Sequence, residues 1–287
     1  MKKIPLNLLM YDGPISRAYL GLFFENGLTF NKIYLLVYKK DLINKKEILK
    51  FFPDFIKQKV AKNIQKYQLN YWVIKLKKTY PEIFRNIKIK MLESTKLNNG
   101  IYDHLINLKH LSLYSKNIEE IFFNNISDLN VLFKKEKKQN FLFTSGGILS
   151  AECFKNNTNK IIHIHPGYLP EVKGADGLLW SLKCKNKAGV SAFYMNEKID
   201  NGKIIYRENF LLPKFDKKLL SLHNNDIYRI IYAYIDPLVR AFCLKKLISI
   251  SNGKMKFKDL LDQKKLSGKT FTFMHNKQKE EIYKKLC

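Results

Sequence analysis

The first forty residues change hydrophobic periodicity twice. A nearly continuous apolar run at residues 4–10 predicts a buried strand, and Asp12-Gly13-Pro14 after it marks a turn. Residues 16–25 repeat their apolar positions at helical spacing, and residues 32–38 form a second strand-like run. The order strand, turn, helix, strand predicts a βαβ unit.

The stretch 41–135 is rich in lysine and mostly helical in period. Three short apolar runs inside it predict further strands, at residues 71–76, 87–91 and 111–114.

The pattern sharpens after residue 138. Residues 140–144 and 160–165 are apolar runs typical of buried parallel strands, and the second run ends at Pro166-Gly167 because proline cannot continue a central ladder. A helix near residues 178–184 and strands at 190–195 and 203–210 follow. The pattern therefore predicts an α/β fold with a mostly parallel, twisted sheet flanked by helices.

The last part of the chain has a different pattern. An amphipathic helix is predicted over about residues 225–247, followed by a basic segment with turn signals. No internal repeat or proline-rich linker interrupts the sequence. We predict an α/β domain at residues 1–212 and a small helical and β appendix at residues 213–287.

Composition limits the cellular setting. The 287 residues are 46% hydrophobic, enough for a sizeable core. No uncharged apolar run approaches the roughly 18 to 20 residues of a membrane span, and the run at residues 4–10 lacks the small-residue cleavage site of a signal peptide. Four widely separated cysteines fit a reducing compartment. These features predict a cytoplasmic protein without a membrane partner.

The formal net charge of +27 raises the question of nucleic-acid binding. Only five of the 52 basic residues are arginines, whereas base readout and bidentate phosphate contacts favour arginine. The charge therefore favours a solvated lysine surface over a nucleic-acid interface, although it would attract small anionic partners.

Two histidines stand at the end of the predicted strand 160–165. Strand alternation places His163 and His165 on one face, at the carboxyl end where open parallel sheets bind ligands. One alternative is a pair of hydrogen-bonded core histidines with a structural role only. Another is a His-x-His metal site with a distant aspartate. The other histidines show no spacing that supplies a further ligand, so no metal is predicted.

Two turns complete the candidate site. Asp200 precedes Asn201-Gly202, a strong hairpin signal, and is either an ordinary turn carboxylate or the group that orients a histidine as a general base. Ser145-Gly146-Gly147 is either a simple strand-to-helix turn or a backbone surface for the edge of a heterocycle. Its spacing is not that of a phosphate-binding fingerprint.

These segments together resemble the formyltetrahydrofolate-dependent formyltransferases. Residues 161–174 (Ile-Ile-His-Ile-His-Pro-Gly-Tyr-Leu-Pro-Glu-Val-Lys-Gly) are similar to the family's Ile-Asn-Ile-His-Pro-Ser-Leu-Leu-Pro-x-x-Arg-Gly. The runs at residues 189–195 and 200–204 resemble its Gly-Val-Thr-x-x-x-Met and Asp-x-Gly-x-Ile segments, and residues 145–149 resemble its folate loop. Order and spacing agree over about residues 139–210.

The resemblance implies an enzyme with a Rossmann-like fold and 10-formyltetrahydrofolate as formyl donor. Of the family's catalytic Asn, His and Asp, the last two match His165 and Asp200, while His163 replaces the Asn. It implies His165 as general base, Asp200 as its orienting carboxylate, and His163 as hydrogen-bond donor to the formyl oxygen. The remaining implied residues are Ser145, Gly146, Gly147, Ile148 and Leu149 for the cosubstrate, and Tyr168, Lys173 and Gly174 for the substrate.

The acceptor is the least constrained feature. Residues 268–275 resemble a tail of stand-alone relatives that modify surface sugars, which implies a small-molecule amine on an amino-sugar nucleotide and a role in surface polysaccharide, such as lipopolysaccharide, biosynthesis. The alternatives are methionyl-tRNA formylation, a hydrolase acting on formyltetrahydrofolate or through a metal, and a non-catalytic protein that binds folate or RNA. The oligomeric state is open, and a homodimer is compatible with the sequence.

Overall fold

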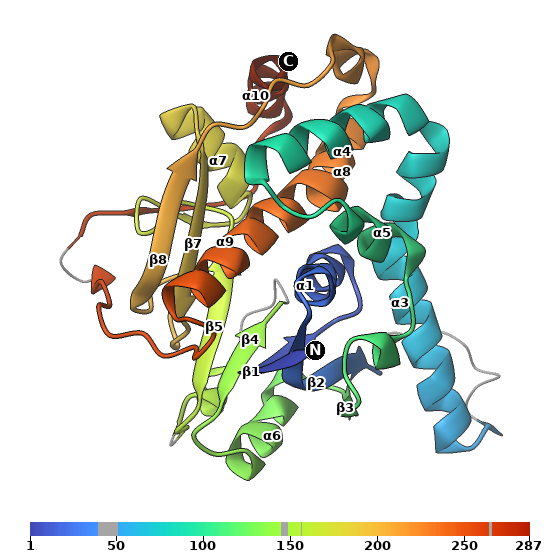
Figure 1. The fold of residues 1–287 in the computed structure, drawn as a ribbon, viewed down its shortest axis with the longest axis vertical. Helices are drawn as coiled ribbons and strands as arrows, with labels where there is room; N and C mark the ends of the chain where they lie inside the picture. Colours follow the sequence, from blue (N-terminus) through green and yellow to red (C-terminus); the bar gives the residue numbers. More distant parts are fainter. Residues whose placement is uncertain (40–50, 145–148, 156, 264–265) are drawn as a thin grey trace.

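The computed structural model describes residues 1–39, 51–144, 149–155, 157–263 and 266–287. Within them lies a seven-stranded sheet with the order β3-β2-β1-β4-β5-β7-β8 (Figure 1). Neighbours from β3 to β5 are parallel, whereas β7 and β8 are antiparallel additions at one edge. The strands are β1 Lys2–Met10, β2 Leu28–Tyr38, β3 Ile118–Phe123, β4 Asn140–Phe143, β5 Lys160–His165, β7 Ala188–Tyr194 and β8 Ile204–Phe210. The predicted α/β fold with a mostly parallel sheet is confirmed.

Helices flank this sheet, and a small second sheet contacts the end of β5 and the β7–β8 turn. The second sheet pairs β6 (Val172–Gly174) in parallel with β9 (Lys269–Phe271), so a C-terminal segment joins one from the middle of the chain. The helices are α1 Pro14–Glu25, α3 Asp54–Thr79, α4 Pro81–Thr95, α5 Gly100–Asn107, α6 Leu129–Lys135, α7 Gly177–Lys185, α8 Asn224–Ile230, α9 Asp236–Ile250 and α10 Asn276–Leu286. No helix in these described segments is long and apolar enough to cross a bilayer.

Alternate strand residues enter two different hydrophobic layers. On one face, side chains such as Ile162 and Ile164 of β5 join the core beneath α1 and α9, which lie side by side in Figure 1. On the other face, Ile161 joins a smaller layer that includes residues of α6. Because side chains alternate along a strand, His163 and His165 point to the side of Ile161, away from the α1 and α9 layer.

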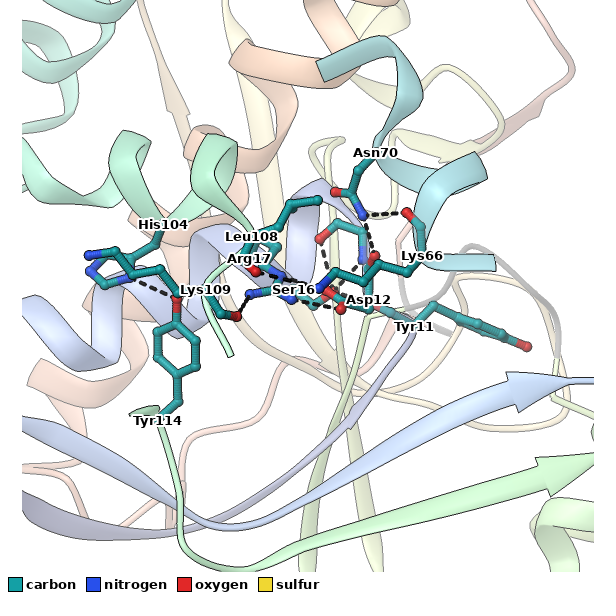
Figure 2. A network of polar contacts seen from close by, with 11 residues as sticks. Tyr11, Asp12, Ser16, Arg17, Lys66, Asn70, His104, Leu108, Lys109 and Tyr114 are labelled. Carbon is teal, nitrogen blue, oxygen red and sulfur yellow. Dashed lines mark hydrogen bonds and ion pairs between the residues drawn. The ribbon is translucent and has the colours of Figure 1, made fainter. Parts of the chain in front are cut away.

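A buried polar network fixes the carboxyl end of β1 (Figure 2). Arg17 of α1 donates from Nε and Nη2 to the Asp12 carboxylate and from Nη1 to the carbonyl of Lys109, while Asn70 of α3 donates to the Asp12 carbonyl. The Arg17 side chain is 0% exposed, and a charge so buried is tolerated only when it is paired and hydrogen-bonded. The network therefore joins β1, α1, α3 and the segment after α5.

The strands predicted inside residues 41–135 are wrong. Residues 71–76 lie within α3, residues 87–91 lie within α4, and residues 111–113 form a single 3-10 turn. In α4 the buried Ile83, Ile87 and Met91 recur every four residues, so they line one face of a helix. Among the described residues of this region the strand is β3, which the sequence analysis missed.

The predicted helix at residues 225–247 is confirmed as a nearly continuous unit. It consists of α8, a π-helical turn at Ile231–Ile235, and α9. Its buried side chains share one hydrophobic core with those of β1 and α1. The boundary at residue 212 stays a prediction.

Candidate active site

A cavity of about 750 Å³ opens at the carboxyl end of β5. Its wall includes His163 and His165 from β5, Asp200 from the turn between β7 and β8, and Arg240 from α9. Apolar side chains dominate the remaining surface, among them Phe193 of β7 and Phe271 of β9. A largely apolar cavity with a few converging polar groups at the end of parallel strands is typical of a small-molecule site.

His163 presents only one of its ring nitrogens to the protein. Its Nδ1 lies 3.0 Å from the carbonyl oxygen of Phe143 on the paired strand β4. A carbonyl only accepts hydrogen bonds, so Nδ1 carries the proton and donates it. In the neutral ring Nε2 is then an unprotonated acceptor, and it has no hydrogen-bond partner among the described residues.

Burial keeps His163 neutral. It lowers the pKa of this histidine to about 4, and the positive charge of Arg240 acts in the same direction, against the opposing effect of Asp200. The ring also packs between Phe143 and Phe193, at centroid distances of 6.3 and 5.9 Å. At neutral pH the side chain is therefore an uncharged imidazole in the cavity wall.

His165 is enclosed on both sides of its ring. Its Nε2 donates to the carbonyl of Val172 at 3.0 Å, and its Nδ1 lies 3.5 Å from Oδ2 of Asp200. Gly167 and Gly177 make room for this ring, because a Cβ at either position would lie 2.5 or 2.8 Å from Nε2. Burial lowers the pKa of His165, and the negative charge of Asp200 opposes that shift.

Asp200 is held in place by backbone. Its Oδ2 accepts the N–H of Gly174 at 2.8 Å, so the carboxylate links the β7–β8 turn to β6. Asp200 has a φ of +47°, in the left-handed region that aspartate tolerates better than most residues. The turn predicted at Asp200-Asn201-Gly202 thus delivers a carboxylate to His165, as the sequence suggested.

Arg240 supplies the buried positive charge of the cavity, and the sequence analysis did not single it out. Its Nε donates to Asp236 one helical turn earlier, at 3.0 Å from Oδ2, and its Nη1 donates to the carbonyl of Ile164 at 2.5 Å. Burial raises the pKa of Asp236, and the charge of Arg240 opposes this. The sequence signal was an Asp and an Arg four residues apart in a segment, residues 236–244, whose other residues are all apolar.

The C-terminal segment forms part of the cavity wall. Phe271 of β9 stacks on Trp180 of α7, with ring centroids 4.4 Å apart, and Trp180 donates from Nε1 to the carbonyl of Thr272. Phe273 also lines the cavity, and 71% of it is exposed. Residues 268–275, which the sequence analysis connected with the acceptor, therefore lie beside the candidate site.

Asp176 connects the elements that form this wall through hydrogen bonds. One carboxylate oxygen accepts the hydroxyls of Tyr228 and Tyr232, each at 2.7 Å, and the other accepts the backbone N–H of Met274 at 2.8 Å. Burial, followed by the hydrogen bond to Asp176, raises the pKa of Tyr228. The carboxylate joins the start of α7, the tyrosines near α8 and the C-terminal segment.

The predicted site residues divide into three groups. His163, His165, Asp200, Gly174 and Leu149 line the cavity. Tyr168 and Lys173 are not part of its lining; Lys173 donates instead to Asn201, and Tyr168 lies against the guanidinium of Arg207. Ser145, Gly146, Gly147 and Ile148 lie outside the described residues. In the described ranges no three His, Cys, Asp or Glu side chains are grouped so that they could hold a metal.

Comparison with known families finds a match to part of the chain. Residues 140–221 match the family model described as Formyl transferase, and this stretch contains His163, His165 and Asp200. The match covers less than half of the chain. The match agrees with the predicted family and with the predicted class of enzyme.

Solved structures of formyltransferases resemble the chain at low identity. A sugar N-formyltransferase from a Shewanella species is 13% identical, with a TM-score of 0.45 over 99% of this chain and 88% of that one. A 4-N formyltransferase from Francisella tularensis is 12% identical, with a TM-score of 0.46 over 99% and 86%. WlaRD, a sugar 3N-formyl transferase solved in the presence of dTDP and 5-N-formyl-THF, is 13% identical, with a TM-score of 0.43 over 93% and 69%. The family match at residues 140–221, not these likenesses, supports the resemblance to formyltransferases.

Proposed function

We propose that this formyltransferase moves a formyl group from 10-formyltetrahydrofolate to a primary amine on an amino-sugar nucleotide, in the cytoplasm. The observation that carries the proposal is the cavity in which His163, His165 and Asp200 of the family segment meet. Its volume of about 750 Å³ lies within the usual range for small-molecule sites. The two reacting groups would be held against each other at the end of β5, which favours transfer by proximity.

The C-terminal wall supports the choice of acceptor. Phe271 and Phe273 offer aromatic faces beside the histidines, suited to a nucleobase or sugar ring. Arg240 and the high net positive charge favour a ligand that carries phosphate. A role in surface-polysaccharide biosynthesis follows from such an acceptor and is part of the proposal.

The test is mass spectrometry of acceptors incubated with 10-formyltetrahydrofolate and the full chain. The panel contains amino-sugar nucleotides, aminoacylated tRNAs and a sample without acceptor. We expect formamido product from an amino-sugar nucleotide. Formylation of initiator methionyl-tRNA alone would favour the tRNA alternative, and release of formate without acceptor would favour a hydrolase.

An Asp200→Asn variant separates catalysis from binding. The amide keeps the shape of the side chain but removes the negative charge beside His165 Nδ1. We expect the rate to fall by about 10² to 10⁴ while tetrahydrofolate affinity is nearly kept. His110→Asn is the matched control, because His110 is exposed and not part of the cavity lining.

A further inference from the structure

The two histidines differ in what their hydrogen bonds leave free. Both Nδ1 of His163 and Nε2 of His165 face backbone carbonyls, which fixes a proton on each of those atoms. The second nitrogen of His165 lies against Asp200, and its side chain is 5% exposed. The second nitrogen of His163 is without a partner among the described residues, in a ring that lines the cavity.

We infer that His163, through Nε2, is the general base that takes the proton from the attacking amine. This inference rests on the proposed formyl transfer. It reverses the roles that the resemblance implied, because there His165 is the base and the residue at 163 donates a hydrogen bond to the formyl oxygen. A neutral imidazole whose Nδ1 already donates to Phe143 has no N–H left for that oxygen.

The proton balance of the reaction is complete with one base. As the amine attacks, its nitrogen forms a bond to the formyl carbon, and the carbonyl electron pair moves to the oxygen. Nε2 of His163 takes the proton that the new C–N bond makes acidic. When the tetrahedral intermediate collapses, the bond to N10 of the folate breaks, and the imidazolium returns its proton to that nitrogen. The products are a formamide and tetrahydrofolate.

The surroundings of His163 suit a base better than a donor. The hydrogen bond to Phe143 orients the ring and favours the charged form once Nε2 is protonated, as a second-shell acceptor does for other catalytic imidazoles. Asp200 lies close enough to stabilise the same charge. Arg240 lines the same cavity and supplies a positive charge that stabilises the developing oxyanion. His165 is then a positioning residue that joins β5 to β6, whereas Asp200 both joins the β7–β8 turn to β6 and stabilises the charge of His163.

The first test determines the tautomer of His163, which can be measured without turnover. In ¹⁵N-histidine-labelled protein, long-range ¹H–¹⁵N spectra distinguish a ring protonated at Nδ1 from one protonated at Nε2, and the His163→Asn variant assigns the signals. We expect His163 to be neutral at pH 7 with its proton on Nδ1. A ring protonated at Nε2, or on both nitrogens, would overturn the inference.

The second test is catalytic and uses His163→Asn and His163→Ala, with His110→Asn as control. If His163 is the base, His163→Asn loses about 10² to 10⁴ in kcat/KM, because an amide can donate but is not basic. Added imidazoles should rescue His163→Ala, with rates that rise as the basicity of the imidazole rises. Substantial transfer by His163→Asn, or rescue that falls with basicity, would show a donor instead.

These outcomes separate the inference from the proposed function. If the wild-type protein transfers no formyl group to any acceptor, the proposed function fails. If the wild type transfers and His163→Asn transfers nearly as well, only the assignment of the base fails. Circular dichroism and tetrahydrofolate binding establish that each variant is folded, so loss of activity is not loss of structure.

Discussion

At the scale of single residues, the site depends on which carbonyl each imidazole meets. His163 and His165 share a face of β5, yet one donates to the neighbouring strand β4 and the other to the first residue of β6. The sequence predicted both residues and the carboxylate at Asp200. It did not predict the tautomers, because these depend on the register that places His163 opposite Phe143.

A second residue of the cavity, Phe273, leads to a prediction about binding of the acceptor. Its ring lines the cavity and is 71% exposed, so a nucleobase can stack on it. Base–aromatic stacking contributes about 1 to 3 kcal/mol, so Phe273→Ala should raise the KM of the sugar nucleotide by about 5- to 150-fold and change the folate KM little. Steady-state kinetics checks this against Phe51→Ala, another exposed phenylalanine that does not line the cavity. Equal effects on both substrates would contradict the stacking role.

At the scale of elements, the hydrogen bonds of a charged residue, Arg240, hold helix α9 against the end of β5. Arg240 bonds Asp236 within the helix and the carbonyl of Ile164 across to the strand. Asp236 is 1% exposed, so its carboxylate depends on that arginine. Hydrophobic periodicity did not predict that this ion pair is buried, because charged residues in a helix are normally assigned to its solvated face.

Removing one partner should therefore cost far more than removing both. Arg240→Met leaves the Asp236 carboxylate buried and unpaired, and should lower the free energy of unfolding by about 3 to 5 kcal/mol. The double variant Asp236→Leu, Arg240→Met should recover much of that loss. Urea denaturation of the three proteins measures both values. A single variant as stable as the wild type would show that the pair does not stabilise the fold.

The elements themselves were predictable to different degrees. β4 and β5 are short, apolar and bounded by turn residues, so their positions followed from the pattern. β3 has two glutamates at its centre and only one fully buried residue, which obscured the strand signal. Within α3 and α4 the buried residues recur at helical spacing, but the apolar runs around them resemble strands when taken alone.

At the scale of the whole molecule, strands β5 and β7, the β7–β8 turn and the C-terminal segment converge on one cavity. The sequence analysis connected the first three through the family segment. The fourth, β9, pairs with β6 across almost a hundred residues of chain, and no local pattern predicts such a pairing. The pairing of β6 with β9 requires a glycine at position 174, because a Cβ there would lie 2.2 Å from the carbonyl oxygen of Phe271.

Burial of the two cavity histidines also makes global stability depend on pH. The pKa of His163 is lowered from 6.5 to about 4, and the pKa of His165 is lowered as well. Between pH 6.5 and pH 4 the unfolded chain binds protons that the folded chain does not, so the free energy of unfolding should fall as pH falls. Each histidine contributes at most about 1.4 kcal/mol per pH unit.

Comparison of variants isolates this effect from that of the carboxylates. Arg240, Asp200 and His165 are the charged or titratable groups that act on His163, and all remain in His163→Asn. Urea denaturation between pH 4 and pH 7 should show that His163→Asn loses less stability on acidification than the wild type. His110→Asn should follow the wild type. Parallel curves for all three proteins would mean that His163 titrates normally in the folded state.

The central claim is formyl transfer at this cavity, and the most direct measurement is the mass of acceptors after incubation with 10-formyltetrahydrofolate. We predict that the wild-type protein converts an amino-sugar nucleotide to its formamido product, that Asp200→Asn and His163→Asn do so at least about a hundredfold more slowly, and that His110→Asn matches the wild type. Absence of formamido product from every amino-sugar nucleotide, under conditions where tetrahydrofolate binds, would contradict the account.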